Sequence, residues 1–289
     1  MVKTIQVVVT GASGFIAKNL RKFLSDNNVN LISISRNDFK SLRNESIIVS
    51  KTYDEKNLIS KIKNSDALVH LIGIGKQTVD IDYNSVNVEF TKNIINLCKK
   101  SKIKKIIYIS GLGVSSKSLT GYFISKYNAE KLIINSGLDY TIFRPSYVVG
   151  KDDYLSKLFK KQIKNHQIQI PGSGNYLIQP IYINDVVKVI FESIIQTKYR
   201  KKVLDLVGPD TVTFSQYVKF LSQKTKTPIK KIKLEDSYHK AITSSKSDYG
   251  IDDLNILVGN FIGNHQKLKN ISQIKYQSVM ELLKSGRLS

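Results

Sequence analysis

Val7-Val8-Val9-Thr10-Gly11-Ala12-Ser13-Gly14-Phe15-Ile16-Ala17 joins an apolar, β-branched run to a glycine turn and then to a helical pattern. Residues 5–9 are predicted to form a strand buried on both faces. Glycine permits the sharp turn and lets the backbone lie against a pyrophosphate, while the following helix N-terminus supplies amide donors and a positive dipole. The stretch predicts a dinucleotide-binding βα unit. A plain strand–helix turn is the alternative, because a lone glycine triplet is a common pattern.

Strand and helix patterns alternate through the first half of the chain. This rhythm predicts an α/β fold with a Rossmann doubly wound parallel sheet and helices on both faces. The strands are expected at 5–9, 31–35, 47–49, 67–72, 105–110 and 140–144, and the helices near 15–27, 54–64, 82–101 and 120–136.

After Pro145 the pattern changes. A basic helix is expected at 151–165, a strand at 177–183, a helix capped by Asn184 and Asp185 that runs to Ile195, and a strand at 202–207. We therefore predict a nucleotide-binding Rossmann domain at 1–150 and a smaller C-terminal substrate-binding cap at 151–289. The unit at 177–208 either belongs to the cap or returns to the main sheet.

The composition limits the class of protein. The chain has 289 residues and 41% hydrophobic content, enough for a substantial core. Its single cysteine, Cys98, excludes disulfide staples and favours a reducing compartment, so a cytoplasmic location is expected. No signal peptide precedes the first strand, and no apolar run approaches the ~18 residues of a transmembrane segment. The four histidines are scattered, and no metal site is predicted.

The formal net charge of +22 invites a nucleic-acid interpretation. However, the chain has 39 lysines and only six arginines, and the lysines are spread over every segment. Nucleic-acid readers favour arginine forks and aromatic platforms gathered on one face. We therefore predict a solvated lysine coat and no specific nucleic-acid partner. The clusters at 157–164 and 198–202 leave open a local patch toward anionic lipid, RNA or an acidic subunit.

The end of the second strand selects the cofactor in a Rossmann unit. An acidic residue there binds the ribose 2′-hydroxyl of NAD, whereas an arginine accommodates the 2′-phosphate of NADP. Here Arg36 follows the strand and no acid occurs before Asp38. The sequence therefore favours NADP, with NAD as the alternative and a solvent-exposed cation as the non-functional interpretation.

Tyr122 and Lys126 lie one turn apart on the helix that follows the fifth strand. A nearby ammonium lowers the pKa of a phenol, which makes tyrosine usable for acid–base chemistry beside a carbonyl or carbinol. The spacing alone is unspecific, because Tyr127 and Lys131 repeat it. That second pair lies about 140° around the same helix and cannot share the site.

With these features the chain resembles the short-chain dehydrogenases/reductases, in their extended or atypical NAD(P)-dependent epimerase/dehydratase branch. The resemblance covers roughly residues 5 to 220, and its short motifs occur in family order. They are the glycine turn from Thr10, Ser65-Asp-Ala-Leu-Val-His-Leu-Ile-Gly, Asn87-Val-Glu-Phe-Thr, Ile107-Tyr-Ile-Ser, Tyr122-x-x-Ser-Lys126, Phe143-Arg-Pro-Ser and Gln179-Pro-Ile-Tyr-Ile-Asn-Asp-Val. Residues 110–122 and the Arg-Pro-Ser turn resemble the subgroup of the NADPH-binding accessory subunit of respiratory complex I.

The resemblance implies a role for each matching residue. Tyr122 would be the acid–base group, and Lys126 would bind the nicotinamide ribose and depress the pKa of that tyrosine. Ser110 would polarise the substrate oxygen, with Ser115 or Ser116 as alternatives, because Gly111-Leu-Gly departs from the hydroxyl-rich family pattern. Ala17 in place of a third glycine is a mild departure. The remaining cofactor residues would be Gly11, Ser13, Gly14, Phe15 and Ile16 at the pyrophosphate, Arg36 at the 2′-phosphate, Leu71, Ile72 and Gly73 along the adenosine, and Pro145 and Ser146 at the nicotinamide.

Two classes of function follow from this resemblance. The first is an NAD(P)-dependent oxidoreductase or epimerase/dehydratase acting on a small-molecule carbonyl or carbinol, with a nucleotide-sugar as one candidate substrate. The second is a non-catalytic NADPH-binding sensor or accessory subunit, as a homodimer or peripherally associated with a larger complex. An RNA-binding protein on the same scaffold rests on charge alone and ranks last.

Overall fold

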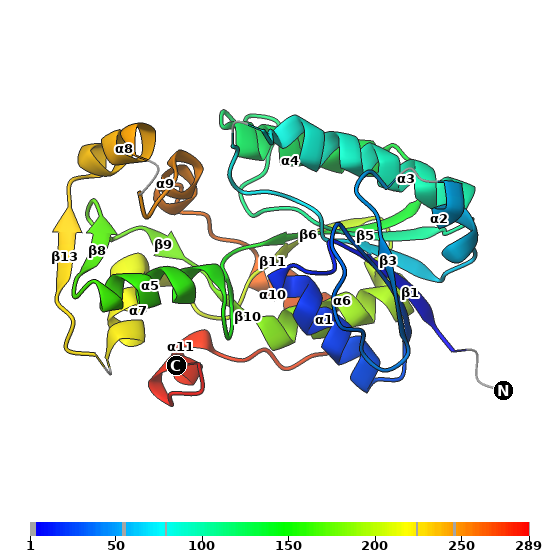
Figure 1. Ribbon diagram of the computed structural model, residues 1–289. Coiled ribbons are helices and arrows are strands. Elements are labelled where there is room, and N and C mark those ends of the chain that lie inside the picture. Colours follow the sequence, from blue (N-terminus) through cyan, green and yellow to red (C-terminus); the bar gives the residue numbers. More distant parts are fainter. Residues whose placement is uncertain (1–3, 54–55, 79, 224, 245–246, 289) are drawn as a thin grey trace.

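The computed structural model describes residues 4–53, 56–78, 80–223, 225–244 and 247–288. Within these residues, seven parallel strands form one sheet in the order β3-β2-β1-β4-β5-β6-β11 (Figure 1). The chain starts in the middle, proceeds to one edge and then crosses to the other, which is the doubly wound arrangement predicted from the sequence. The strands are β1 Gln6–Thr10, β2 Asn30–Ser35, β3 Glu45–Val49, β4 Ala67–His70, β5 Lys105–Ile109, β6 Asp139–Pro145 and β11 Lys202–Leu206.

Helices cover both faces of the sheet (Figure 1). On one face, Leu20 and Leu24 of α1 and Val186 of α6 pack against Val7 and Val9 of β1. The bounds of the helices around the sheet are α1 Phe15–Asp26, α2 Lys56–Lys61, α3 Phe90–Lys100, α4 Gly121–Ile134, α6 Ile183–Ile195 and α10 His265–Ile271, with a short 3₁₀ turn, η2 Thr197–Tyr199.

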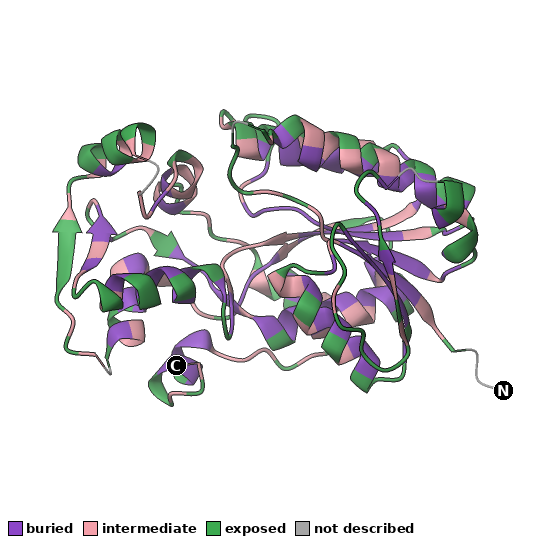
Figure 2. Ribbon diagram, in the orientation of Figure 1, coloured by how far each residue is buried: buried purple, intermediate pink, exposed green. Residues whose placement is uncertain are grey.

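On the other face, Ile94 of α3 and Ala129 and Ile133 of α4 pack against Val8 of β1. Adjacent residues of β1 therefore point into different hydrophobic cores, which is why its sequence is continuously apolar. Figure 2 shows the strands largely buried between helices whose outer surfaces are exposed. This sandwich fixes the carboxyl ends of the strands, where ligands bind in such sheets.

A smaller C-terminal lobe lies beside the carboxyl end of the sheet, at the left of Figure 1. It has its own core, in which Phe159, Phe214 and Tyr217 are fully or almost fully buried. Three two-stranded sheets join its segments: β7 with β10, β9 with β12, and β8 with β13. The elements are β7 Val148–Val149, β8 Ile168–Pro171, β9 Leu177–Ile178, β10 Ile181–Tyr182, β12 Val212–Thr213, β13 Ile229–Ile232, α5 Tyr154–Lys164, α7 Phe214–Ser222, α8 Leu234–Thr243, α9 Ile251–Val258 and α11 Val279–Lys284.

The structure corrects two predictions near residue 180. The single strand expected at 177–183 is two short strands, β9 and β10, in different sheets. Pro180 lacks an N–H for a continuous ladder, and the Gln179 side chain instead donates to the carbonyl of Gly208. The N-cap of α6 is Tyr182, so Asn184 and Asp185 lie in the first turn. Strand β11 joins the main sheet beside β6, while the division at residue 150 stays a prediction.

Two helices on the face of the sheet that α3 covers also differ from their predicted bounds. The helix expected at 82–101 begins with a π-helical turn, η1 Asn84–Glu89, and continues as α3. The helix expected at 54–64 is observed as α2, which ends at Lys61, and residues 54–55 lie outside the described part. Within the described residues, no helix is long and apolar enough to cross a membrane.

Candidate active site

The glycine turn between β1 and α1 is closed by a hydrogen bond from the Gly14 amide to the Gly11 carbonyl, at 2.9 Å. Gly11 has a φ of +67°, and a Cβ there would lie 2.9 Å from the backbone of Leu71. Only glycine therefore suits this position. Gly14 is the N-cap of α1, and the first helical turn has neither an acidic residue nor a side-chain cap. Its amides and dipole are available to an anion, so the turn fits a pyrophosphate.

The glycine turn leads to the predicted adenosine and ribose residues through close backbone packing. A Cβ on Gly11 would meet Leu71 and the amide of Ile72. Two residues further on, a Cβ on Gly73 would lie 2.7 Å from Nζ of Lys126. The segments around residues 11, 72 and 126 are thus in contact one after the other along the carboxyl edge of the sheet. The structure brings these predicted residues together.

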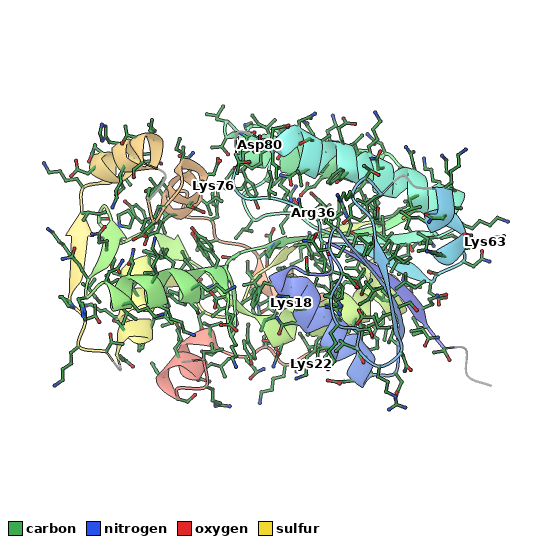
Figure 3. All side chains as sticks on the ribbon, in the orientation of Figure 1. Lys18, Lys22, Arg36, Lys63, Lys76 and Asp80 are labelled. Atoms are coloured by element: carbon green, nitrogen blue, oxygen red, sulfur yellow. The ribbon has the colours of Figure 1, made fainter. Side chains whose placement is uncertain are left out.

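Arg36 follows directly after β2 and is exposed. It forms no hydrogen bond or ion pair with the residues that the structure describes. Figure 3 shows it on the side of the sheet that faces the C-terminal lobe, while Lys63 lies at the opposite edge. Nearby, the hydroxyls of Ser35 and Ser13 are 3.4 Å apart, which links the end of β2 to the glycine turn. A phosphate beside the turn would therefore meet an uncompensated guanidinium.

Tyr122 and Lys126 lie in the first turns of α4, whose N-cap Thr120 accepts a hydrogen bond from the Phe123 amide. Lys126 is 5% exposed, and its Nζ donates to the carbonyl of Ile109 at 3.3 Å. The Tyr122 hydroxyl lies next to Gly111, where a Cβ would be 3.1 Å from it. Lys126 therefore contacts the last residue of β5, and Tyr122 lies beside the loop that follows it.

The electrostatics of this pair differ from the expectation. Burial, together with the nearby Asp252 carboxylate, raises the pKa of Tyr122 to about 12. Burial also lowers the pKa of Lys126 to about 8, partly opposed by Glu130. The prediction that Lys126 depresses the pKa of Tyr122 is wrong for this structure, because the ammonium is directed at Ile109 and Gly73. Tyr122 is thus a proton donor at neutral pH.

Ser110 lies at the end of β5 and is 4% exposed. Its Oγ has no hydrogen-bond partner among the described residues. A buried hydroxyl without a partner costs free energy unless a ligand supplies one. Ser115 and Ser116, the alternatives, are exposed and do not line the adjoining cavity. Of the three serines, Ser110 alone lines the cavity beside Tyr122.

A cavity of about 270 Å³ lies between the Rossmann sheet and the C-terminal lobe. From the sheet side it is lined by Ser110, Gly111, Tyr122, Pro145 and Ser146. Two of the three predicted catalytic residues, Ser110 and Tyr122, therefore share one cavity with the predicted nicotinamide residues, whereas Lys126 does not line it. Its other wall comes from the C-terminal lobe and includes Tyr154, Leu177, Phe214, Tyr249 and Ile256.

The sequence analysis missed two residues that hold Tyr122. The ring of Tyr83 packs edge-on against Tyr122 with centroids 6.0 Å apart. The Tyr83 hydroxyl donates to Asp252 of α9, and the carbonyl oxygen of Gly75 lies 3.0 Å from the same hydroxyl as an alternative acceptor. Residue 252 is 169 positions from residue 83, so no local pattern could reveal this contact.

Asn87 is a third positioning residue, quoted in a motif but given no role from the sequence. It is fully buried, and its amide donates to Ser125 Oγ at 2.9 Å. Its carbonyl oxygen accepts from the Ile74 amide at 3.0 Å. Asn87 thereby joins the loop after β4 to helix α4 and holds Gly73 beside Lys126.

His70, at the end of β4, is buried between Thr10 and Thr91 with its ring nitrogens 2.9 and 3.1 Å from their hydroxyls. Burial and the neighbouring Lys126 lower its pKa to about 3, so it is neutral. Its two hydrogen bonds therefore connect the ends of β1 and β4 to helix α3, next to Lys126.

Comparisons with known proteins agree with this geometry. The family model described as NAD(P)H-binding matches residues 11–171. The chain is 22% identical over 257 residues to subunit 9 of the NADH dehydrogenase (ubiquinone) 1 alpha subcomplex, mitochondrial, of Arabidopsis thaliana. That match covers 85% of this chain but 64% of the relative, so the chain spans less than two thirds of the relative's length.

Solved structures share the fold. A nucleoside-diphosphate-sugar epimerase from Staphylococcus aureus superposes with a TM-score of 0.78 at 17% identity, covering 97% of this chain and 100% of that chain. A UDP-glucuronic acid 4-epimerase from Bacillus cereus, in complex with UDP-glucuronic acid and NAD, gives a TM-score of 0.75 at 17% identity, covering 97% of each chain. At these identities the likeness establishes the architecture alone.

Proposed function

This chain belongs to the NAD(P)H-binding family of extended short-chain dehydrogenases/reductases, and we propose that it is an NAD(P)-dependent oxidoreductase or epimerase/dehydratase. The observation that carries the proposal is the continuous line from the glycine turn through Gly73 and Lys126 to Tyr122 and Ser110. The first part of the line fits a dinucleotide, and the last part adjoins a cavity that can hold a small substrate. A cytoplasmic location stays a prediction.

The residues present fit a nicotinamide dinucleotide. Gly11, Ser13, Gly14, Phe15 and Ile16 would hold its pyrophosphate, Leu71, Ile72 and Gly73 its adenosine side, and Lys126 its ribose. Pro145 and Ser146 would flank the nicotinamide, which supplies or accepts a hydride. Lys126 also keeps a positive charge beneath this groove at neutral pH, because its pKa of about 8 lies above 7.

The chain's own chemistry is proton transfer to the substrate oxygen. In a carbonyl reduction, for which a bound nicotinamide would supply the hydride, the substrate oxygen would take the Tyr122 proton and become a hydroxyl group. Ser110 Oγ, which lacks a protein partner, donates to the same oxygen and stabilises its developing charge. In the reverse direction Tyr122 accepts the proton, and an epimerase runs both directions in one turnover.

The test of this function is Tyr122→Phe with Tyr127→Phe as its matched control. The first change removes the phenolic proton but keeps the ring packing, so dinucleotide binding should persist while kcat falls by at least ~10². Tyr127 lies on the outer face of the same helix, beside Lys131, and its replacement should leave kcat nearly unchanged. Near-normal turnover in Tyr122→Phe would refute the mechanism.

A second candidate function is a non-catalytic NADPH-binding accessory subunit. Its support is the match to a subunit of mitochondrial NADH dehydrogenase over 85% of the chain. This role predicts tight dinucleotide binding with no turnover of any carbonyl compound, and equal binding in wild type and Tyr122→Phe. Detectable turnover that depends on Tyr122 would exclude it.

A further inference from the structure

The cavity beside Tyr122 lacks basic side chains. No lysine, arginine or histidine occurs among its lining residues, all of which are described. This is unexpected in a chain with 45 lysines and arginines and a net charge of +22. Lys126 is directed away from the cavity, toward Ile109 and Gly73. The charged residues that do line the cavity are two acids, Asp153 and Asp253.

Both carboxylates are held by donors that carry no charge. Asp153 accepts from the backbone and hydroxyl of Ser156 and from the Gly150 amide. Asp253 accepts from the Tyr154 hydroxyl at 2.9 Å and from the Gly250 amide at 2.8 Å. Neither forms an ion pair with a described residue. The charged groups in the lining are therefore negative only; burial, and after it the charge of Asp253, raises the pKa values of Tyr147 and Tyr154.

The rest of the wall is apolar and aromatic. Phe261 packs edge-on against Phe123 with ring centroids 5.2 Å apart. Ile178, Leu257 and Phe214 close the opposite wall from the C-terminal lobe. Such a surface binds aromatic or aliphatic groups by removing apolar area from water. Among the polar groups of the lining, Ser110 and Tyr122 are the two that the proposed function places at the reacting oxygen.

We propose that this cavity binds an uncharged carbonyl compound or alcohol with an aromatic or aliphatic body, and that it disfavours substrates bearing a diphosphate. The proposal rests on the proposed function, because Tyr122 and Ser110 must face the reacting oxygen. A diphosphate placed among these walls would lose its hydration without gaining a cation, and it would lie near two carboxylates. Phosphate sites normally supply arginine or lysine.

The size of the cavity supports the same class of substrate. Its volume of about 270 Å³ is slightly below the ~300 Å³ at which sites for drug-sized ligands begin. An aromatic ketone is of suitable size. On this proposal the nucleotide-sugar suggested by the family resemblance is disfavoured by the charge of the lining, which holds two carboxylates and no cation.

The first experiment compares neutral and anionic ligands on the protein loaded with NADP⁺, so that a bound ketone is not reduced during the titration. The probe is prodan, a neutral naphthyl ketone whose fluorescence reports apolar surroundings, and the competitors are acetophenone, 4-acetylbenzoate and UDP-glucose. The two aryl ketones differ by one carboxylate. We expect saturable prodan binding, displacement by acetophenone, and at least tenfold weaker displacement by 4-acetylbenzoate and UDP-glucose. No prodan binding, or displacement by UDP-glucose at lower concentration than by acetophenone, would overturn the proposal.

Variants then test the charge and the wall separately. Asp253→Asn keeps an acceptor for Tyr154 but removes one negative charge. The gap in affinity between the two aryl ketones, measured as the ratio of the concentrations at which 4-acetylbenzoate and acetophenone displace prodan, should therefore shrink by several fold. Ile256→Gln places an amide in the cavity wall and should weaken prodan binding roughly tenfold. Its control is Ile251→Gln on the same helix α9, where Ile251 is 44% exposed and outside the lining. An unchanged gap in Asp253→Asn, or equal effects of the two isoleucine changes, would contradict the proposal.

The outcomes separate this inference from the proposed function. NADPH and NADH affinities are measured on the same samples. Binding of neither dinucleotide would refute the proposed function, whatever prodan does. Normal NADPH binding and Tyr122-dependent turnover of UDP-glucose would keep the proposed function and overturn the substrate class.

Discussion

At the scale of single residues, Lys126 couples stability to function. Its ammonium is 5% exposed, and its pKa is lowered to about 8 by burial. A lysine whose folded pKa is depressed destabilises the fold below that pKa, and the penalty fades as pH rises toward the unfolded value near 10.5. The free energy of unfolding should thus rise between about pH 8 and pH 10.5 from this group.

Lys126→Met should therefore stabilise the protein while weakening NADPH binding. At pH 7 the variant should be more stable by up to about 3 kcal/mol, less the lost hydrogen bond to Ile109, and the difference should shrink above pH 8. Urea unfolding at pH 7 and pH 10 measures this. Lys131→Met, on the exposed side of the same helix, should change stability by no more than about 0.5 kcal/mol. A destabilised Lys126→Met at pH 7 would show that the ammonium is not penalised by burial.

Arg36 is the residue that we expect to select the cofactor. It is exposed and without a partner among the described residues, so a 2′-phosphate would gain a charge-assisted contact worth about 1.5–3 kcal/mol, or roughly ten- to more than hundredfold in affinity. Calorimetric titration of NADPH and NADH should show that preference in wild type and its selective loss in Arg36→Ala. Equal affinities in wild type would leave NAD as the cofactor.

At the scale of elements, the turn from β1 to α1 can be tested through its two glycines. Gly14 has a φ of −71°, which any residue adopts, and a Cβ there would lie 3.3 Å from the Gly11 carbonyl oxygen, so a side chain requires that oxygen to shift by a few tenths of an ångström. Gly14→Val should fold but cover the N-terminus of α1, and NADPH binding should fall at least a hundredfold. Gly11→Val forces a β-branched residue to a φ of +67° and should destabilise the fold itself. Unchanged NADPH affinity in Gly14→Val would mean that the pyrophosphate lies elsewhere.

The sequence predicted elements well where the pattern was local. The doubly buried strands around Val8 and the alternation of strand and helix gave the main sheet, with ends displaced by one or two residues. The β9–β10 break was missed because 177–183 is apolar apart from Gln179 and so resembles one strand, although Pro180 interrupts the ladder. The C-terminal lobe depends on distant contacts, such as the Leu177 amide donating to Asn260. Tyr83 and Asp252 meet in the same way, so no window of sequence contains the signal.

At the scale of the whole molecule, the basic side chains that give the net charge of +22 lie mainly on the surface, and none of them lines the candidate cavity. On α5, Lys157, Lys160 and Lys164 are exposed, and Lys161 pairs with Asp248 at 2.7 Å. Buried ion pairs use arginine instead: Arg21 with Glu45, and Arg144 with Glu130. The lysines thus act mainly through solvation, and the arginines that the fold uses are not free to read bases.

We therefore expect RNA and duplex DNA to bind only weakly. Without base contacts, counterion release is the main favourable term, so Kd should lie at about 10⁻⁴–10⁻⁶ M at ~150 mM salt and rise steeply with salt. Fluorescence anisotropy would measure this. Lys160→Glu/Lys164→Glu and the matched pair Lys201→Glu/Lys202→Glu should weaken binding to the same degree, since a diffuse coat has no preferred patch. A nanomolar Kd, sequence discrimination, or an effect confined to the α5 pair would instead make that helix a nucleic-acid surface, with the dinucleotide site as its regulatory input.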